Sequence, residues 1–130
     1  MDMEGALRSR LLAAAPVTAL AAQRIYWVDR PQATALPAIT LQIIDENRAQ
    51  HMGGFQGLQM ATVQVDIWAT TYAQGKTLKE AVIAALVPEI TINGVTFGRA
   101  FVRARDLSER TDTQFIHRPS LDFTINYSAQ

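Results

Sequence analysis

The sequence predicts an α+β fold, in which a mostly antiparallel sheet is flanked by two helices and residues 1–130 form a single domain. Residues 62–68 alternate aliphatic with polar side chains, as a half-buried strand does. Residues 71–87 repeat aliphatic side chains at helical spacing, after a Thr71–Gln74 capping box and before Pro88. The other strand patterns are short and separated by turn residues, which favours hairpin pairing.

The N-terminal segment predicts the second flanking helix. Asp2 can cap it and Pro16 closes it, with a short further turn through Leu20. Met3, Leu7, Leu11 and Ala14 share one face of this helix, and Arg8 and Arg10 are expected to point elsewhere.

Further strands are expected over residues 24–28, 38–44, 97–105 and 114–127. Pro119 should mark a sheet edge or a bulge in the last of them, because it has no backbone N–H. Asn93-Gly94 between β-branched residues predicts a tight hairpin. The polar, glycine-rich segment 45–57 is expected to be a long mobile loop, and segment 106–112 a charged turn.

Composition excludes several classes of protein. Twelve basic residues balance twelve acidic ones, which argues against a protein that coats nucleic acid. The chain has no cysteine, so disulfides, thiolate catalysis and cysteine metal sites are excluded. It begins without a signal-peptide pattern, and its longest weakly polar run, residues 11–22, is too short to span a bilayer. We expect a soluble protein made in the cytoplasm, with no membrane partner.

The sequence contains no recognisable catalytic arrangement. His51 and His117 have no partner at metal-ligand spacing, which favours solvated or hydrogen-bonded histidines. Gly53-Gly54 lies in a glycine-rich segment that lacks the Lys-Ser/Thr pair of a phosphate loop. We therefore expect no catalytic residue, no metal and no cofactor, and we expect that the protein is not an enzyme.

Two patterns on the strands have competing interpretations. Asp66 lies mid-strand, and we favour an outward carboxylate paired with an arginine of a neighbouring strand. Arg99, Arg103 and Arg105 share a face with Phe101, which fits a contact surface for DNA or an acidic neighbour as well as a solvated face. Three aromatic residues are either core or interface anchors: Trp27, Trp68 and Tyr72.

Six short motifs occur in order along the chain: LRSRLL at 7–12, RIYW at 24–27, RPQ at 30–32, LPAI at 36–39, VDIWA at 65–69 and LDF at 121–123. In this order and spacing they resemble the tail-completion (tail-terminator, head–tail joining) proteins of long-tailed bacteriophages and prophages. The resemblance spans nearly the whole chain and is weakest in residues 45–57 and 89–101.

The resemblance implies a non-catalytic virion protein. Such proteins form a ring, commonly hexameric, that caps the finished tail tube and joins it to the head connector or stopper protein. The implied location is the head–tail junction of the virion, with assembly in the cytoplasm of the bacterial host and DNA passing the lumen without specific binding. Two alternatives stay open: a neighbouring head-completion or adaptor ring protein, and a small non-catalytic α+β binding module.

A ring subunit needs a head-to-tail contact with its own copies and contacts with the neighbouring rings. We expect these contacts in the segment around Gly53-Gly54 and in the charged region near residues 105–112. The hypothesised interface residues are Arg48, His51, Gly53, Gly54, Phe55, Arg99, Arg103, Arg105 and Arg110.

Overall fold

The computed structural model describes the backbone of residues 3–29, 35–51, 54–110 and 115–129. Its elements in chain order are α1 (Met3–Leu12), α2 (Ala15–Ala21), β1 (Ile25–Trp27), β2 (Ala38–His51), β3 (Gly54–Trp68), α3 (Tyr72–Leu86), β4 (Ile90–Ile92), β5 (Val95–Phe97), β6 (Phe101–Arg110) and β7 (Phe115–Ala129). No helix within these residues is long and apolar enough to cross a membrane.

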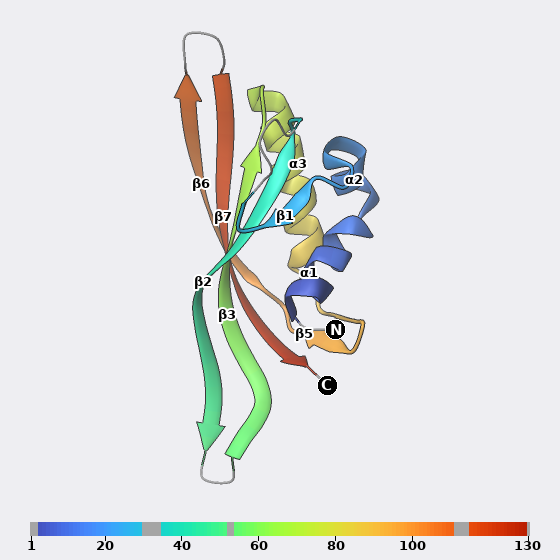
Figure 1. Cartoon of the computed structure of the whole chain (residues 1–130), viewed down its shortest axis with the longest axis vertical. Helices are drawn as coiled ribbons and strands as arrows, with labels where there is room; N and C mark the ends of the chain where they lie inside the picture. Colours follow the sequence, from blue (N-terminus) through green and yellow to red (C-terminus); the bar gives the residue numbers. More distant parts are fainter. Residues whose placement is uncertain (1–2, 30–34, 52–53, 111–114, 130) are drawn as a thin grey trace.

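The seven strands form one twisted sheet in the order β1-β2-β3-β7-β5-β4, with β6 also paired to β7 (Figure 1). Each neighbouring pair is antiparallel except β1 and β2, which are parallel. The α+β class is confirmed, although the sheet is mixed. The expectation of two flanking helices is wrong, because the described residues form three helices and all lie on the same side of the sheet.

The core lies between the helices and one face of the sheet. Over residues 61–67 of β3 and 121–127 of β7, every second side chain is buried, including Val63, Val65, Leu121 and Phe123. The helices contribute Leu7, Leu11, Leu78, Val82 and Leu86 to the same cluster. Each buried aliphatic or aromatic side chain contributes roughly 1.5–3 kcal/mol to stability. The predicted alternation of residues 62–68 is therefore confirmed.

Helix α3 follows its sequence signals closely. Thr71 is the N-cap, and its side-chain oxygen accepts a hydrogen bond of 3.1 Å from the backbone N–H of Gln74. The reciprocal half of the capping box is displaced by one residue, because Gln74 Oε1 accepts from the backbone N–H of Thr70 at 3.4 Å. The helix ends at Leu86, two residues before Pro88.

The N-terminal helices differ from expectation at one residue. Met3, Leu7 and Leu11 are buried as predicted, and Pro16 lies in the first turn of α2, while Asp2 lies outside the described residues. Arg10, however, is only 5 % exposed and donates a hydrogen bond from Nη2 to the carbonyl oxygen of Pro88. Pro88 lies two residues after the end of α3, so this hydrogen bond joins α1 to the segment between α3 and β4.

The expected long loop over residues 45–57 is wrong. Strand β2 continues to His51 and β3 starts at Gly54, with pairs from Asp45–Thr62 to His51–Gly54. Beyond the Leu58–Ser128 pair, β3 has no partner in β7. In this two-stranded ribbon the sequence lacks the alternation that marks a half-buried strand, so pattern alone did not predict it.

The expected charged turn over residues 106–112 is also wrong in part. β6 runs through it to Arg110, and residues 111–114 lie outside the described residues. The strand expected over 97–105 is divided instead: β5 pairs with the end of β7, residues 98–100 cross over, and β6 pairs with the first two thirds of β7.

The two turn signals of the C-terminal half have different outcomes. Asn93 and Gly94 both have positive φ, of 52° and 82°, so the predicted tight hairpin between β4 and β5 is confirmed. Pro119 lies inside the sheet between β6 and β3, not at an edge. The β3–β7 ladder stops at the Asp66–Ser120 pair and resumes with a bridge between Ala69 and His117, which leaves Pro119 where no N–H is required.

Candidate assembly interface

Two β-ribbons extend from the sheet body in opposite directions (Figure 1). We call residues 48–51 and 54–57 the β2–β3 arm, because β3 pairs there with β2 alone. We call residues 107–110 and 115–118 the β6–β7 arm, where β7 pairs with β6 and touches β3 only through the His117–Ala69 bridge. Each arm has strand edges that no other described strand covers, and such edges are available to a partner.

The β2–β3 arm is anchored where it leaves the body. The Tyr127 hydroxyl donates to Gln59 Oε1 at 2.8 Å and lies 3.3 Å from Glu46 Oε1. Because Tyr127 is only 4 % exposed, these hydrogen bonds fix the direction of the arm from within the core. The arm is thus a directed projection and not a loose loop.

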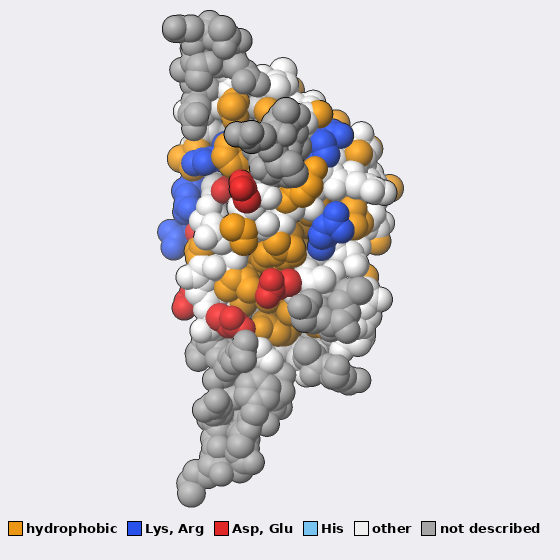
Figure 2. All heavy atoms as spheres, in the orientation of Figure 1, with side chains coloured by type: hydrophobic (Ala, Val, Ile, Leu, Met, Phe, Trp, Pro, Cys, Tyr) orange, Lys and Arg blue, Asp and Glu red, His pale blue; other side chains and the backbone are white. Residues whose placement is uncertain are grey.

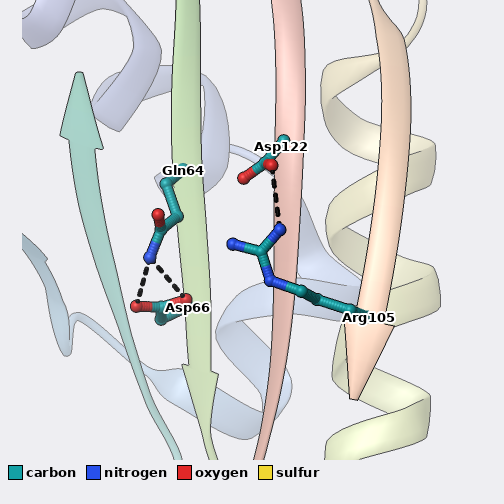
Figure 3. Close-up of polar contacts among 4 residues, drawn as sticks. All are labelled: Gln64, Asp66, Arg105 and Asp122. Carbon is teal, nitrogen blue, oxygen red and sulfur yellow. Dashed lines mark hydrogen bonds and ion pairs between the residues drawn. The ribbon is translucent and has the colours of Figure 1, made fainter. Parts of the chain in front are cut away.

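The sheet face opposite the helices is polar. On it, Gln64 Nε2 donates to both carboxylate oxygens of Asp66, at 3.2 and 3.0 Å, and Arg105 Nη1 lies 3.2 Å from Asp122 Oδ2 (Figure 3). Asp66 points outward as expected, but the expectation that an arginine pairs with it is wrong. Gln64 lies two residues away on the same face of β3 and reaches Asp66, whereas Arg105 pairs across β6 and β7.

An aromatic group continues this polar face. Trp68 Nε1 donates to Thr40 Oγ1 at 3.0 Å, and the Arg118 guanidinium lies 5.0 Å from the centre of the Trp68 ring. This stacking is a cation–π contact. Trp68 is therefore neither a core residue nor a fully exposed one, because its indole N–H bonds to β2 and a face of its ring lies against Arg118 of β7.

Two polar atoms of this face have no hydrogen-bond partner within the described residues: Ser120 Oγ and Asp122 Oδ1. Both belong to side chains turned toward the Gln64–Asp66 side of the sheet, since Ser120 pairs with Asp66 and Asp122 with Gln64. Buried polar atoms in folded proteins normally have partners. This face therefore keeps hydrogen-bonding capacity.

Large apolar side chains are exposed around the molecule. The most exposed are Val28 and Phe101, each at 70 %, followed by Tyr72 at 56 % and Ile44 at 47 %. Figure 2 shows basic side chains along the edge occupied by β6 and β7 and also on the helical side, and acidic side chains both in the upper middle of the view and lower down, where β2 and β3 leave the body. Charges of both signs are therefore mixed on this face.

His117 is packed into the base of the β6–β7 arm. It is 3 % exposed, its Nδ1 lies 3.2 Å from Ser108 Oγ, and its ring centre lies 4.9 Å from that of Tyr72. Gly75 of α3 lies against the same ring, since a Cβ at that position would be 2.6 Å from His117 Cδ2. The prediction that His117 is hydrogen-bonded is confirmed.

The hypothesised interface residues lie in three places. Arg48, His51, Gly54 and Phe55 are in the strands of the β2–β3 arm, at positions whose backbone alone is described, and Gly53 lies outside the described residues. Arg103 and Arg105 are exposed on β6, and Arg99 is exposed just before it. Arg110 is the last residue of β6, again described by its backbone alone. The set is therefore not one cluster.

Several residues of these surfaces had no sequence signal strong enough to find them. In the sequence, the neighbours of Arg10 and Arg118 do not distinguish them from solvated arginines. Only the tertiary structure brings Arg10 to Pro88 and Arg118 to Trp68. Gly75 did have a signal, because glycine inside a helical repeat costs about 1 kcal/mol and implies close packing. Among the described residues, no three His, Asp or Glu side chains gather as a metal site would require.

Comparison with known proteins gives one family and two solved structures. Residues 5–128 match the family described as tail completion protein gp17. A chain from the "Virion of native gene transfer agent (GTA) particle" is 19% identical with a TM-score of 0.75, and the alignment covers 98% of this chain and 95% of that one. A second solved structure, without a functional name, is 13% identical with a TM-score of 0.59 and 98% and 93% coverage. No curated protein has a significantly similar sequence.

The two structures share the fold of this chain over nearly its whole length, and one of them is part of a gene transfer agent virion. The family match covers almost every element, from α1 to the end of β7. The resemblance found in the six sequence motifs is thereby confirmed, and the chain belongs to the tail completion protein gp17 family.

Proposed function

We propose that this chain is the subunit of a ring, six-fold as is common among tail-terminator proteins, that caps the finished tail tube and joins it to the head connector. The role is structural and involves no catalytic step. The ring is built in the cytoplasm of the bacterial host and remains at the head–tail junction of the virion. The observation that supports this most strongly is the pair of arms pointing in opposite directions from one sheet.

A ring between two other rings must contact a partner on each side. The β2–β3 arm and the β6–β7 arm give the subunit one projection toward each side, and each arm has uncovered strand edges within the described residues. An extended edge binds a partner strand through backbone hydrogen bonds. One arm would contact the tail-tube protein and the other the connector or stopper protein.

The charge of the chain fits passage of DNA through the ring. Basic and acidic residues balance at twelve each, and the polar sheet face combines Arg105 with Asp66 and Asp122. A strongly basic lumen would hold DNA through many phosphate contacts. We infer that DNA passes without specific binding.

Shortening each arm tests this function. Replacing residues 50–57 with an Asn-Gly turn removes the end of the β2–β3 arm and leaves the Tyr127–Gln59 anchor in place. We expect a folded protein with normal circular dichroism that no longer supports joining of purified heads and tails. The matched variant replaces residues 110–115 with Asn-Gly and shortens the β6–β7 arm. Each variant should lose one contact, with the tube or with the connector, and keep the other.

The two variants control for each other, because each replaces the end of one ribbon, residues 50–57 or residues 110–115, with a two-residue turn and leaves the core unchanged. Normal head–tail joining by both shortened proteins would contradict the proposed role of the arms. Loss of both contacts in either variant, with the fold intact, would show that the arms do not divide the two partners between them.

A further inference from the structure

Val28 has an unusual combination of exposure and backbone conformation. Its φ is 71°, in the left-handed region, and its side chain is 70 % exposed. Two hydrogen bonds hold it there: Val28 N–H donates to Leu41 O at 2.7 Å, and Asp29 N–H donates to Trp27 O at 2.8 Å. Positive φ is a genuine outlier for a β-branched residue, and such strain gathers at functional positions. Glycine or asparagine would adopt this turn more easily, so we infer that the exposed valine side chain has a binding role.

A groove of about 250 Å³ lies elsewhere on the helical side of the molecule. Its walls come from the end of α1, the end of α3 and β4, and they are mostly apolar. The lining residues are Arg10, Ala13, Ala14, Ala85, Pro88, Glu89, Ile90 and Ile92. Ile90 is 42 % exposed at its border. The groove is large enough for a small aliphatic side chain.

The groove contains a buried positive charge without a negative partner. Arg10 is 5 % exposed, donates from Nη2 to Pro88 O, and its guanidinium carbon lies 5.4 Å from the centre of the Phe97 ring. No carboxylate of the described residues forms an ion pair with it, and burial lowers the pKa of Arg10 below its usual value. A guanidinium has five N–H donors, so donors remain for a carboxylate. Glu89 lines the groove but is exposed, and it forms no ion pair with Arg10. A carboxylate from another molecule could therefore bind to Arg10 inside the groove.

The exposed valine and the groove face different sides of helix α1. Arg8 Nε donates to Ile25 O of β1 at 2.8 Å, on the side of α1 where the Val28 turn follows. Arg10 points from α1 toward Pro88, on the side of the groove. The two surfaces cannot meet within one molecule, but they can meet between copies. Such a contact is heterologous, and it closes into a ring when the rotation between copies allows it.

We propose that Val28 and Asp29 of one copy dock in the Arg10 groove of the next copy. The Val28 side chain fills the apolar part of the groove, and the Asp29 carboxylate accepts hydrogen bonds from Arg10. Of the two most exposed apolar side chains, Val28 and Phe101, charge complementarity favours Val28, because Asp29 follows Val28 whereas Phe101 has Arg99 and Arg103 beside it. The proposal rests on the proposed ring and supplies the contact between its subunits.

Disulfide trapping tests the contact directly, because the natural chain has no cysteine. An isotope-labelled Val28→Cys chain is mixed with an unlabelled Ala13→Cys chain, oxidised mildly and weighed by mass spectrometry. Ala13 is exposed at the border of the groove, so both variants should fold. The control replaces Val28→Cys with Tyr72→Cys, at a position that is also exposed. The dimer of Val28→Cys with Ala13→Cys should form at least tenfold faster than the dimer of Tyr72→Cys with Ala13→Cys. Equal rates for Val28→Cys and Tyr72→Cys would overturn the proposal.

Val28→Gly separates assembly from folding. Glycine relieves the strain at this turn, so the melting temperature should equal or exceed that of the natural chain, while the association constant for the ring falls at least tenfold. Unchanged assembly would overturn the proposed contact. A ring that forms without the Val28–Ala13 cross-link would support the proposed ring and refute the proposed Val28 contact. A specific cross-link in a chain that never forms a ring would support the contact and refute the ring.

Discussion

The sheet body and the arms of this protein differ in what stabilises them. In the body, helices α1 and α3 cover one face, and β3 and β7 bury every second side chain against them. In the β2–β3 arm, the strands pair with each other but lie beyond the last pair with β7. The body is therefore held by apolar burial, while the arm depends on backbone hydrogen bonds and on the Tyr127 anchor at its base. Substitution of a buried side chain in the body should change folding, and shortening of an arm should change assembly.

The largest expected effect comes from the centre of the body. Phe123 is fully buried on β7, and Phe123→Ala should lower the free energy of unfolding by about 3–5 kcal/mol through lost burial and a cavity. Phe101, paired in register with the neighbouring Thr124, is the matched control. Because Phe101 is 70 % exposed, Phe101→Ala should stay within about 0.5 kcal/mol of the natural chain in urea unfolding. Similar losses for the two variants would contradict the distinction between surface and core.

An intermediate effect is expected where the body meets the β6–β7 arm. Gly75→Ala places a Cβ 2.6 Å from His117 Cδ2, so the buried ring must move. We expect a net loss of about 1–2 kcal/mol, although alanine favours a helix over glycine by about 1 kcal/mol. In a His117→Ala background the same substitution should become stabilising. Loss of stability in both backgrounds would show that contact with the ring is not the cause.

The smallest effect is expected on the polar sheet face. The Arg105–Asp122 ion pair is 3.2 Å long, and the arginine side chain is 53% exposed. Solvent screens such a pair, so Arg105→Ala should cost less than about 1 kcal/mol in thermal or urea unfolding. Any effect on head–tail joining at unchanged stability would mark this face as a contact surface. A loss well above 1 kcal/mol would instead make it part of the structural body.

The same contrast explains which elements the sequence could predict. Helix α3 and the strand around Val63 and Val65 have a buried face, and burial imposes a period that is visible in the residues. Residues 48–51 and 54–57 show no such period in the sequence, so the glycines and polar residues there were compatible with a loop. Pairing decided the outcome, because the backbone groups of β2 and β3 that face each other pair as far as His51–Gly54, with two register shifts on the way.

The candidate site could be predicted only in part. The basic face of β6 follows from the spacing of Arg103 and Arg105, since alternate residues share a side of a strand. The burial of Arg10 and the exposed, strained Val28 could not be predicted, because both depend on contacts between segments far apart in the chain. Pro88 and Leu41, their hydrogen-bond partners, lie 78 and 13 positions away.

Native mass spectrometry of the chain, alone and with assembled tails that lack it, tests the central claim most directly. A ring subunit should appear as one closed species, with six copies expected, either in solution at high concentration or on the end of the tail tube. Shortening both arms should leave this ring intact but release it from the tail. A chain that stays monomeric in solution and does not bind the tube would contradict the account.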